Sequence, residues 1–98
     1  MVSEHFDRID VKRQNREIIT HTGYYRDMHI SVLSTGMGTD NIDIVMNEID
    51  ALFNIDLKER VVKDERTSLN IVRIGTSGGL QPGISPDSTV VSTHGVGL

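Results

Sequence analysis

The sequence predicts an α/β fold of one domain. Three observations predict it: a β-hairpin pattern in REIITHTGYYRDMHISVLST, an amphipathic helix pattern in TDNIDIVMNEIDALFNI, and a short apolar run, LNIVRIG, of the buried kind found in α/β sheets. A strand, a helix and a returning strand make a βαβ crossover. A chain of 98 residues has room for a single domain at most.

The first expected elements are the end of a helix and a hairpin. In MVSEHFDRID the apolar residues recur at helical spacing with no N-cap ahead of them, which predicts the tail of a helix. Residues 17–22 and 28–34 are rich in β-forming residues and flank Gly23. We therefore expect two paired strands with the turn at that glycine.

A core-facing helix is expected over residues 42–53. Thr39 or Asp40 would cap it, and Asp43 would lie in its first turn, where a carboxylate is favourable beside the helix dipole. The spacing i, i+3, i+4, i+7 places on one face Ile42, Val45, Ile49, Leu52 and Phe53.

The second half of the chain predicts an exposed connection followed by strands and a loop. Residues 56–68 are charged and lack a sustained period, which predicts a frayed helix end and an exposed connection. LNIVRIG then predicts a buried strand, QPGISPDS a loop, and STVVSTHGVGL another strand at its start. Nothing remains to cover the second face of the sheet, so we expect a fragment of a longer protein.

Composition excludes several classes of protein. The formal net charge of −4 argues against non-specific nucleic-acid binding, which needs a basic face. The chain has no cysteine, which excludes disulfides and thiolate metal sites. No apolar run approaches the ~20 residues of a membrane span, and Met1 is not followed by a signal-peptide pattern. We expect a cytoplasmic protein with no membrane or nucleic-acid partner.

Two glycine-containing motifs match known sites only in part. GTSGG has the G-x-S-x-G form around Ser77, but the prolines that follow prevent the helix that this motif requires. His21, Asp43 and Ser77 follow the order of trypsin-like proteases, but those enzymes need two β-barrels, and Asp43 falls on the expected helix. In STGMGTDN, Asn41 replaces the third glycine of a dinucleotide fingerprint, and Asp40 would repel a pyrophosphate. The four histidines lack metal-ligand spacing, so no metal is expected.

Arg73 is the residue with the clearest chemical requirement. It stands inside the apolar run LNIVRIG, where a guanidinium is costly without an anion. One partner would be a carboxylate such as Glu48. The other would be a bound oxyanion, held by the guanidinium, the Thr76 hydroxyl and the backbone N–H groups of the GTSGG glycines. On chemistry alone, both partners stay open.

Three ordered motifs, NREIITHTGYY, STGMGTDNIDIVMNEIDAL and NIVRIGTSGGLQPGI, resemble the first half of the uridine phosphorylase branch of the nucleoside phosphorylases. The resemblance covers nearly the whole chain. It implies a three-layer α/β/α fold with a mixed central sheet, here truncated at both ends, so that residues 1–98 make a partial nucleoside phosphorylase domain. It also implies pairing into a homodimer or a higher homo-oligomer.

The same resemblance implies residue roles. Arg73, Gly75 and Thr76, in the RIGT motif, would bind phosphate, and Thr76 would also contact the ribose. Arg16, in NREI, would reach across a dimer interface to the neighbour's phosphate. Met37, in STGMG, would line the pocket beside the ribose.

A monovalent cation is not assigned. Glu17 matches a carboxylate that helps to hold such an ion in some family members, but another ligand position of that site is Asn41 in this chain.

The activity that the resemblance implies is phosphorolysis without a cofactor. A nucleoside, which the resemblance to this branch implies is uridine, and inorganic phosphate would become a free base and ribose 1-phosphate. No residue of this chain is expected to transfer a proton, and the chain alone is expected to hold a phosphate half-site without activity. Purine nucleoside phosphorylase, nucleosidase, a non-catalytic oxyanion-binding or nucleotide-binding module and a purely interfacial fragment stay open as alternatives.

Overall fold

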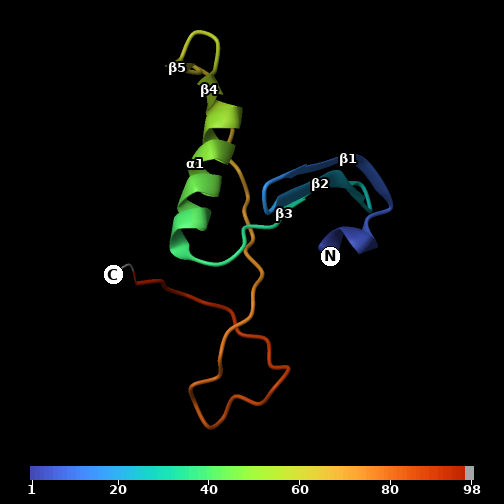
Figure 1. The fold of residues 1–98 in the computed structure, drawn as a ribbon, viewed down its shortest axis with the longest axis vertical. Helices are drawn as coiled ribbons and strands as arrows, with labels where there is room; N and C mark the ends of the chain where they lie inside the picture. Colours follow the sequence, from blue (N-terminus) through green and yellow to red (C-terminus); the bar gives the residue numbers. More distant parts are fainter. Residues whose placement is uncertain (97–98) are drawn as a thin grey trace.

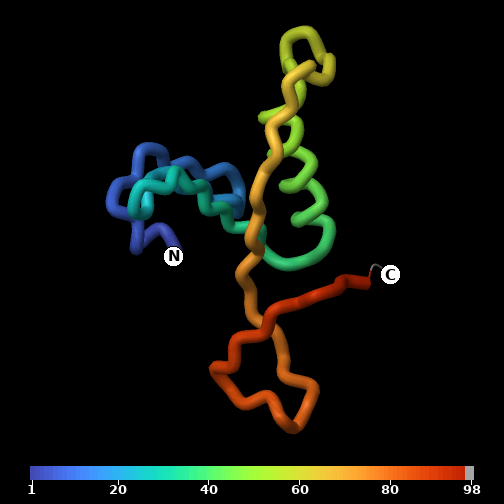
Figure 2. The backbone as a smooth tube through the Cα atoms, turned by 180° about the vertical axis from the view of Figure 1, so that it is seen from behind, coloured from blue at the N-terminus to red at the C-terminus, as the bar shows by residue number. Residues whose placement is uncertain are grey.

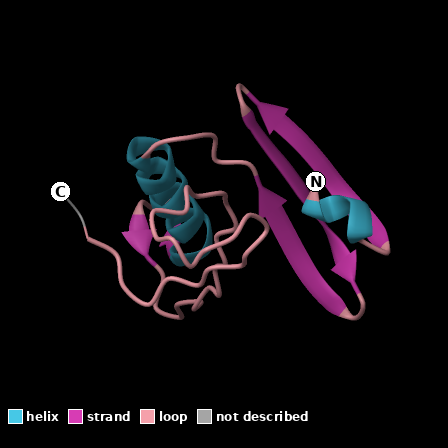
Figure 3. Ribbon diagram, turned by 90° about the horizontal axis from the view of Figure 1, so that it is seen from below, coloured by secondary structure: helices cyan, strands magenta, loops and turns pink. Residues whose placement is uncertain are grey.

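The chain folds into a three-stranded antiparallel sheet, a long helix beside it and an extended C-terminal segment (Figure 1). The computed structural model describes residues 1–96. Gly97 and Leu98, which end the expected C-terminal strand segment, lie outside the described residues. The described part measures 54 × 38 × 27 Å, and Figure 3 shows the helix next to one side of the sheet.

The sheet contains β1 (Arg8–Asn15), β2 (Ile18–Tyr25) and β3 (Met28–Leu33) in that order. The predicted hairpin of β2 and β3 is confirmed, but its turn lies at Arg26 and Asp27, between the paired residues Tyr25 and Met28. Both turns of the sheet begin with an arginine at positive φ, Arg16 at 54° and Arg26 at 41°.

Gly23 lies inside β2, so the prediction that it forms the turn is wrong. It pairs with Ile9 of β1 just before a β-bulge, where the register shifts between Ile9 and Val11. A Cβ on Gly23 would stand 2.0 Å from the carbonyl oxygen of Arg8. The glycine is therefore required because the β1 backbone passes directly over it.

The N-terminus begins with a short 3₁₀ helix, η1 (Val2–His5). The expected helical tail is thus confirmed for one turn only, because Phe6 is extended and β1, which was not predicted, follows. Ser3 is 3% exposed, and its Oγ lies 2.7 Å from Nδ1 of His21 in β2. This contact fastens η1 to the sheet.

The predicted helix is confirmed as α1 (Thr39–Asn54). Its N-cap is Gly38 and no side chain caps it, so the capping role expected of Thr39 or Asp40 is wrong. Asp40, rather than Asp43, is the acidic residue of the first turn.

The apolar face of α1 points toward the sheet without closing onto it. Val45 is the one buried apolar side chain among the described residues, at 7% exposure. A hollow of about 170 Å³ remains between the two elements, lined by Ile18, Leu33, Ile44, Val45, Glu48, Ile49 and Leu52.

A short hairpin follows α1 where a frayed helix end was expected. Its strands are β4 (Ile55–Asp56) and β5 (Val61–Val62), and the helix stops at Asn54 because Ile55 is already extended. The prediction for residues 56–68 is therefore wrong in its first part. Residues 64–68 are exposed, as expected for a connection.

The two strands expected in the second half do not form within residues 1–96. LNIVRIG and STVVST have no ladder partner, and Val72 is 84% exposed. A buried strand needs a neighbour on its edges and cover on its faces, and the outer edge of β3 stays unpaired here. The βαβ crossover is consequently absent from the described residues.

The structure is nevertheless of the α/β kind, with a small antiparallel sheet and one helix. Every strand pair in the described part is antiparallel, so the mixed sheet and the three layers stay predictions. Between residues 1 and 96, no helix is long and apolar enough to cross a membrane.

Candidate functional site

The RIGT segment lies on the extended stretch that runs back along α1 and then past its N-terminal end (Figure 2). Residues 70–79 are exposed. Arg73 therefore does not occupy the buried strand position that the sequence predicts. Within the described part of the chain, it forms no ion pair, so the alternative pairing with Glu48 is not found.

Arg73 and Gly75 lie against each other. The position of a Cβ on Gly75 is 3.5 Å from Nη1 of Arg73 and 3.6 Å from its Cζ and Nη2. The guanidinium thus folds over the backbone two residues further on, immediately before Thr76. No hydrogen bond within residues 1–96 uses the backbone N–H groups of residues 75–79, so they are available to a ligand.

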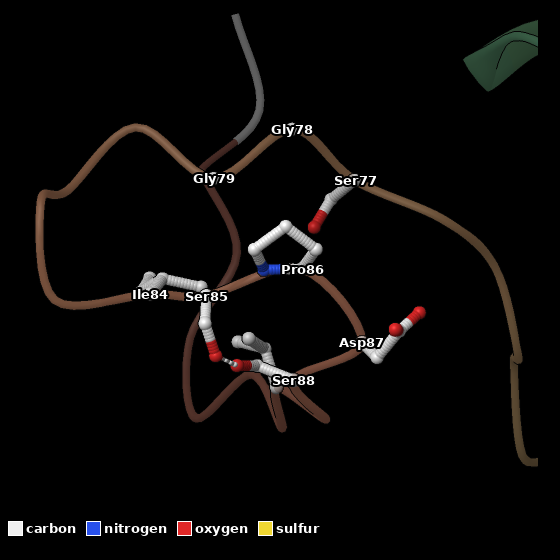
Figure 4. Close-up of a pocket in the computed structure, with 9 residues that line it drawn as sticks. Ser77, Gly78, Gly79, Ile84, Ser85, Pro86, Asp87 and Ser88 are labelled. Carbon is white, nitrogen blue, oxygen red and sulfur yellow. Dashed lines mark hydrogen bonds between the residues drawn. The ribbon is translucent and has the colours of Figure 1, made fainter.

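A hollow of about 330 Å³ adjoins this segment (Figure 4). Two backbone bonds shape its far wall: Ile84 N–H donates to Gln81 O at 3.1 Å, and Ser88 N–H donates to Ser85 O at 3.3 Å. The lining residues come from one loop and are Ser77, Gly78, Gly79, Ile84, Ser85, Pro86, Asp87, Ser88 and Val90.

The hollow is rich in hydroxyl groups. The Oγ atoms of Ser85 and Ser88 lie 3.2 Å apart, and the Ser77 hydroxyl is directed toward Pro86 (Figure 4). Hydroxyls donate and accept hydrogen bonds, which suits a polyhydroxylated or amide-bearing ligand. Ser85 and Ser88 are not among the site residues predicted from the sequence. The turn pattern SPDS, which begins and ends with these serines, is the sequence feature that could have indicated them.

Met37 lies on the loop that leads into α1. Gly36 and Gly38 flank it at φ values of 64° and 101°, and Asn41 Nδ2 donates to its carbonyl oxygen at 3.2 Å. Both glycines occupy conformations that other residues rarely adopt. The Met37 side chain is 93% exposed and so is free to line a ligand site.

Arg16 lies at the tip of the β1–β2 turn, on a different element from Arg73. Its carbonyl oxygen accepts a hydrogen bond from Gln14 Nε2 at 3.2 Å, and its side chain is exposed. Within residues 1–96 no hydrogen bond joins Arg16, Met37 and Arg73 to one another. Arg73, Gly75 and Thr76 lie together on one segment. Arg16 and Met37 lie on other elements and form no hydrogen bond with that segment within residues 1–96.

The protease-like arrangement is not assembled. His21 contacts Ser3 rather than Ser77, and Asp43 lies on α1, where its carboxylate accepts from Asn47 Nδ2 at 3.2 Å. In the described part, no three histidine, aspartate or glutamate side chains gather in a metal-binding cluster.

The pKa shifts belong to exposed contacts outside this site. A hydrogen bond from the N-terminal ammonium lowers the pKa of Glu4. A hydrogen bond to Asp10 raises the pKa of Arg8, whose guanidinium also lies 4.5 Å from the centre of the Tyr24 ring.

Known proteins match the chain over nearly its whole length. The family model of the phosphorylase superfamily matches residues 1–97. A uridine phosphorylase of Treponema pallidum (strain Nichols) is 30% identical over 95 residues, which cover 97% of this chain and 31% of that protein. A DeoD-type purine nucleoside phosphorylase of Thermoanaerobacter sp. (strain X514) is 35% identical over 71 residues, 72% of this chain and 25% of that protein.

A solved structure is also similar. It is a Trypanosoma brucei nucleoside phosphorylase, described as showing uridine phosphorylase activity. The two structures superpose with a TM-score of 0.60 and are 39% identical in sequence, and the match covers 70% of this chain and 22% of that chain. The chain thus spans less than a third of the length of the curated relatives described above. The chain belongs to the phosphorylase superfamily, and its fold is part of a nucleoside phosphorylase fold.

Proposed function

We propose that residues 1–98 form a partial nucleoside phosphorylase domain and supply the phosphate half-site of an enzyme that converts uridine and inorganic phosphate to uracil and ribose 1-phosphate. The observation that carries the proposal is the RIGT segment. Its guanidinium lies over Gly75, 3.5 Å from the position of a Cβ, next to the Thr76 hydroxyl and to unused backbone N–H groups. A guanidinium, a hydroxyl and free amides together suit a phosphate dianion.

The proposed roles follow from these donors. Arg73 binds two phosphate oxygens through its planar guanidinium, and Thr76 donates a hydrogen bond to the phosphate and contacts the ribose. The Gly75 Cβ position lies in van der Waals contact with the guanidinium, so the Gly75 backbone and the guanidinium face the same ligand. Met37 lines the ribose side of the site, and the hydroxyl-rich hollow after Thr76 supports placing the nucleoside next to the phosphate.

The reaction needs no protein proton donor among these residues. The bond from C1′ to the base nitrogen breaks with its electron pair leaving on the base, and an oxygen of hydrogen phosphate forms the new bond to C1′. The proton that hydrogen phosphate loses in forming the ester ends on the base nitrogen, so the step balances without a proton from the protein. The ribose carries oxocarbenium character between these events. Phosphate held beneath C1′ stabilises that positive charge. Arg73 and Thr76 therefore contribute by positioning and electrostatics, and each residue lowers the activation free energy by roughly 3 kcal/mol at most.

We further propose a homodimer or larger homo-oligomer in which Arg16 reaches the neighbour's phosphate. The exposed position of Arg16 at a turn tip supports this role. The apolar side chains of residues 71–74 and 90–91 are exposed in this chain, which supports the proposal that other layers of a three-layer α/β/α fold, with a mixed sheet, cover them.

The test uses a polypeptide of the relatives' length that contains residues 1–98. We expect phosphate-dependent release of uracil from uridine, and a loss of at least about a hundredfold in kcat/KM for Arg73→Ala, as for removal of other preorganised anion-binding groups. Arg66→Ala, which removes an exposed arginine seven residues away, serves as the control and should keep full activity. Phosphate binding without base release would contradict the proposed activity.

A purine substrate is the second candidate, because a purine nucleoside phosphorylase is also similar to this chain. The longer match to a uridine phosphorylase favours uridine. Phosphorolysis of inosine in preference to uridine by the same polypeptide would assign the purine activity instead.

A further inference from the structure

Asn54 joins the end of α1 to the stretch of chain that leads to Arg73. It is 8% exposed and is the last residue of the helix. Its side-chain Nδ2 donates to Asp50 Oδ1 at 2.7 Å and to the Thr67 carbonyl oxygen at 3.2 Å. Its Oδ1 accepts from the Thr67 N–H at 2.7 Å. One side-chain amide thus holds both backbone groups of Thr67.

This arrangement reproduces a pair of β-ladder hydrogen bonds with a side chain in place of a strand. Both polar atoms of the Asn54 amide are satisfied, as burial requires. Lys63 adds to the same junction: its N–H donates to Asn54 O at 2.9 Å, and its Nζ donates to Phe53 O at 2.9 Å. The end of α1 is therefore tied to residues 63–67 at several points.

Hydrogen bonds of this kind do not continue beyond Thr67 in the described part of the chain. Within residues 1–96, no hydrogen bond links residues 68–96 to residues 1–67. Thr67 is thus the last hydrogen-bonded attachment before Arg73, six positions later. Six extended residues span roughly 20 Å at most. Figures 1 and 2 show the stretch after β5 running back along α1, so the direction in which the chain leaves Thr67 sets the path of the segment that carries Arg73.

We propose that Asn54 is a positioning residue for the phosphate site: by holding Thr67, it sets the path of the segment that carries Arg73 and Thr76. The proposal rests on the proposed function of that segment. Asn54 touches no substrate and acts through Thr67. Its removal should therefore change the path of the segment and the affinity for phosphate while α1 and the sheet stay folded.

The experiment measures path and affinity separately on the 98-residue chain. Because the chain has no cysteine, Met46→Cys on α1 and Asn70→Cys after Thr67 give one unique pair of spin labels, both at exposed positions. Pulsed electron resonance reports the distribution of distances between them. Titration with inorganic phosphate, followed by heteronuclear NMR on the unlabelled chain, reports affinity.

The matched variants are Asn54→Ala and Asn47→Ala. Asn47 lies on the same helix, and its amide bonds only to Asp43, at 2.8 and 3.2 Å. We expect Asn54→Ala to broaden the distance distribution and to weaken phosphate binding about tenfold, the equivalent of ~1.4 kcal/mol. Asn47→Ala should change neither. Asn54→Asp keeps the acceptor for Thr67 N–H but loses the donor and places a second carboxylate beside Asp50, so its affinity should fall below that of the unsubstituted chain.

Two results would overturn the proposal. One is a distance distribution in Asn54→Ala as narrow as in the unsubstituted chain. The other is a broadened distribution with phosphate affinity unchanged. Phosphate affinity that is insensitive to Arg73→Ala would contradict the proposed function instead, and the spin-label distances, which need no phosphate, would still decide whether Asn54 holds the segment.

Discussion

Gly23 and Arg8 approach so closely that a Cβ on the glycine would stand 2.0 Å from the arginine carbonyl oxygen. The atoms that this Cβ would meet all belong to the backbone of β1, so a side chain can be accommodated only if β1 moves. We expect Gly23→Ala to lower the free energy of unfolding by about 3 kcal/mol or to prevent the sheet from forming. Urea denaturation of the chain measures this. Gly83→Ala is the control, because within residues 1–96 no atom beyond the glycine and its two chain neighbours lies within 4 Å of its Cβ position. Equal losses in the two variants would contradict the expectation.

The contact between Ser3 and His21 is predicted to stabilise the N-terminus. Ser3→Ala removes a buried hydroxyl and leaves the His21 nitrogen without its partner, which should cost about 1 kcal/mol. Ser31→Ala provides the comparison, since its hydroxyl bonds to Thr22 at an exposed site and should contribute roughly 0.5 kcal/mol or less. Denaturation curves for both variants should rank in that order. The reverse order would show that η1 does not depend on this contact.

Asp56 is predicted to make the β4–β5 hairpin sensitive to acid. Hydrogen bonds from the backbone N–H groups of Glu59 and Lys58 hold the pKa of Asp56 below its usual 3.8. A carboxyl with a lowered pKa stabilises the folded state above its unfolded pKa, and this stabilisation is lost as the pH falls through the folded pKa. The amide resonances of Lys58 and Glu59 should therefore shift with a midpoint below pH 3.8 and should not do so in Asp56→Asn. A midpoint at or above 3.8 would contradict this.

A substitution at Arg16 distinguishes a role of this residue in phosphate binding from its role in the β1–β2 turn. Because Arg16 has φ 54°, Arg16→Gly should relieve about 1 kcal/mol of backbone strain while removing the guanidinium. In an oligomeric polypeptide of the relatives' length, we expect weaker phosphate binding with assembly unchanged in sedimentation. Arg26→Gly is the matched control, since Arg26 occupies the same place in the next turn at φ 41°. If both variants bind phosphate equally well, Arg16 is not a phosphate ligand.

The elements that the sequence predicts correctly are those with local causes. Helix α1 follows from the i, i+3, i+4, i+7 spacing within one segment, and the β2–β3 hairpin follows from β-forming residues close in sequence. The strand expected at LNIVRIG is absent because a strand exists only with a ladder partner, which sequence spacing does not supply. The sequence does not predict the position of Gly23 inside β2, because the requirement for a glycine comes from the β1 backbone at Arg8, fifteen residues earlier.

In the candidate site, too, contacts between residues close in sequence can be predicted, and contacts between distant residues cannot. Arg73 and Gly75 are two positions apart, so their proximity can be predicted from the order of residues alone. Asn54 and Thr67 are thirteen positions apart, with a hairpin between them, and no sequence motif predicts that they form hydrogen bonds. The roles of Arg73, Thr76, Gly75, Arg16 and Met37 stay predictions that the experiments above decide.

Within residues 1–96, no hydrogen bond joins the chain beyond Thr67 to the sheet or to α1, and this determines how the protein unfolds. Denaturant sensitivity scales with the surface that becomes exposed in a cooperative transition. Residues 68–96 are mostly exposed already, so they add little to that surface. The slope of a urea transition should therefore correspond to a cooperative unit of roughly two thirds of the chain. The amide hydrogens of residues 68–96 should exchange by local fluctuations that do not require the sheet to unfold.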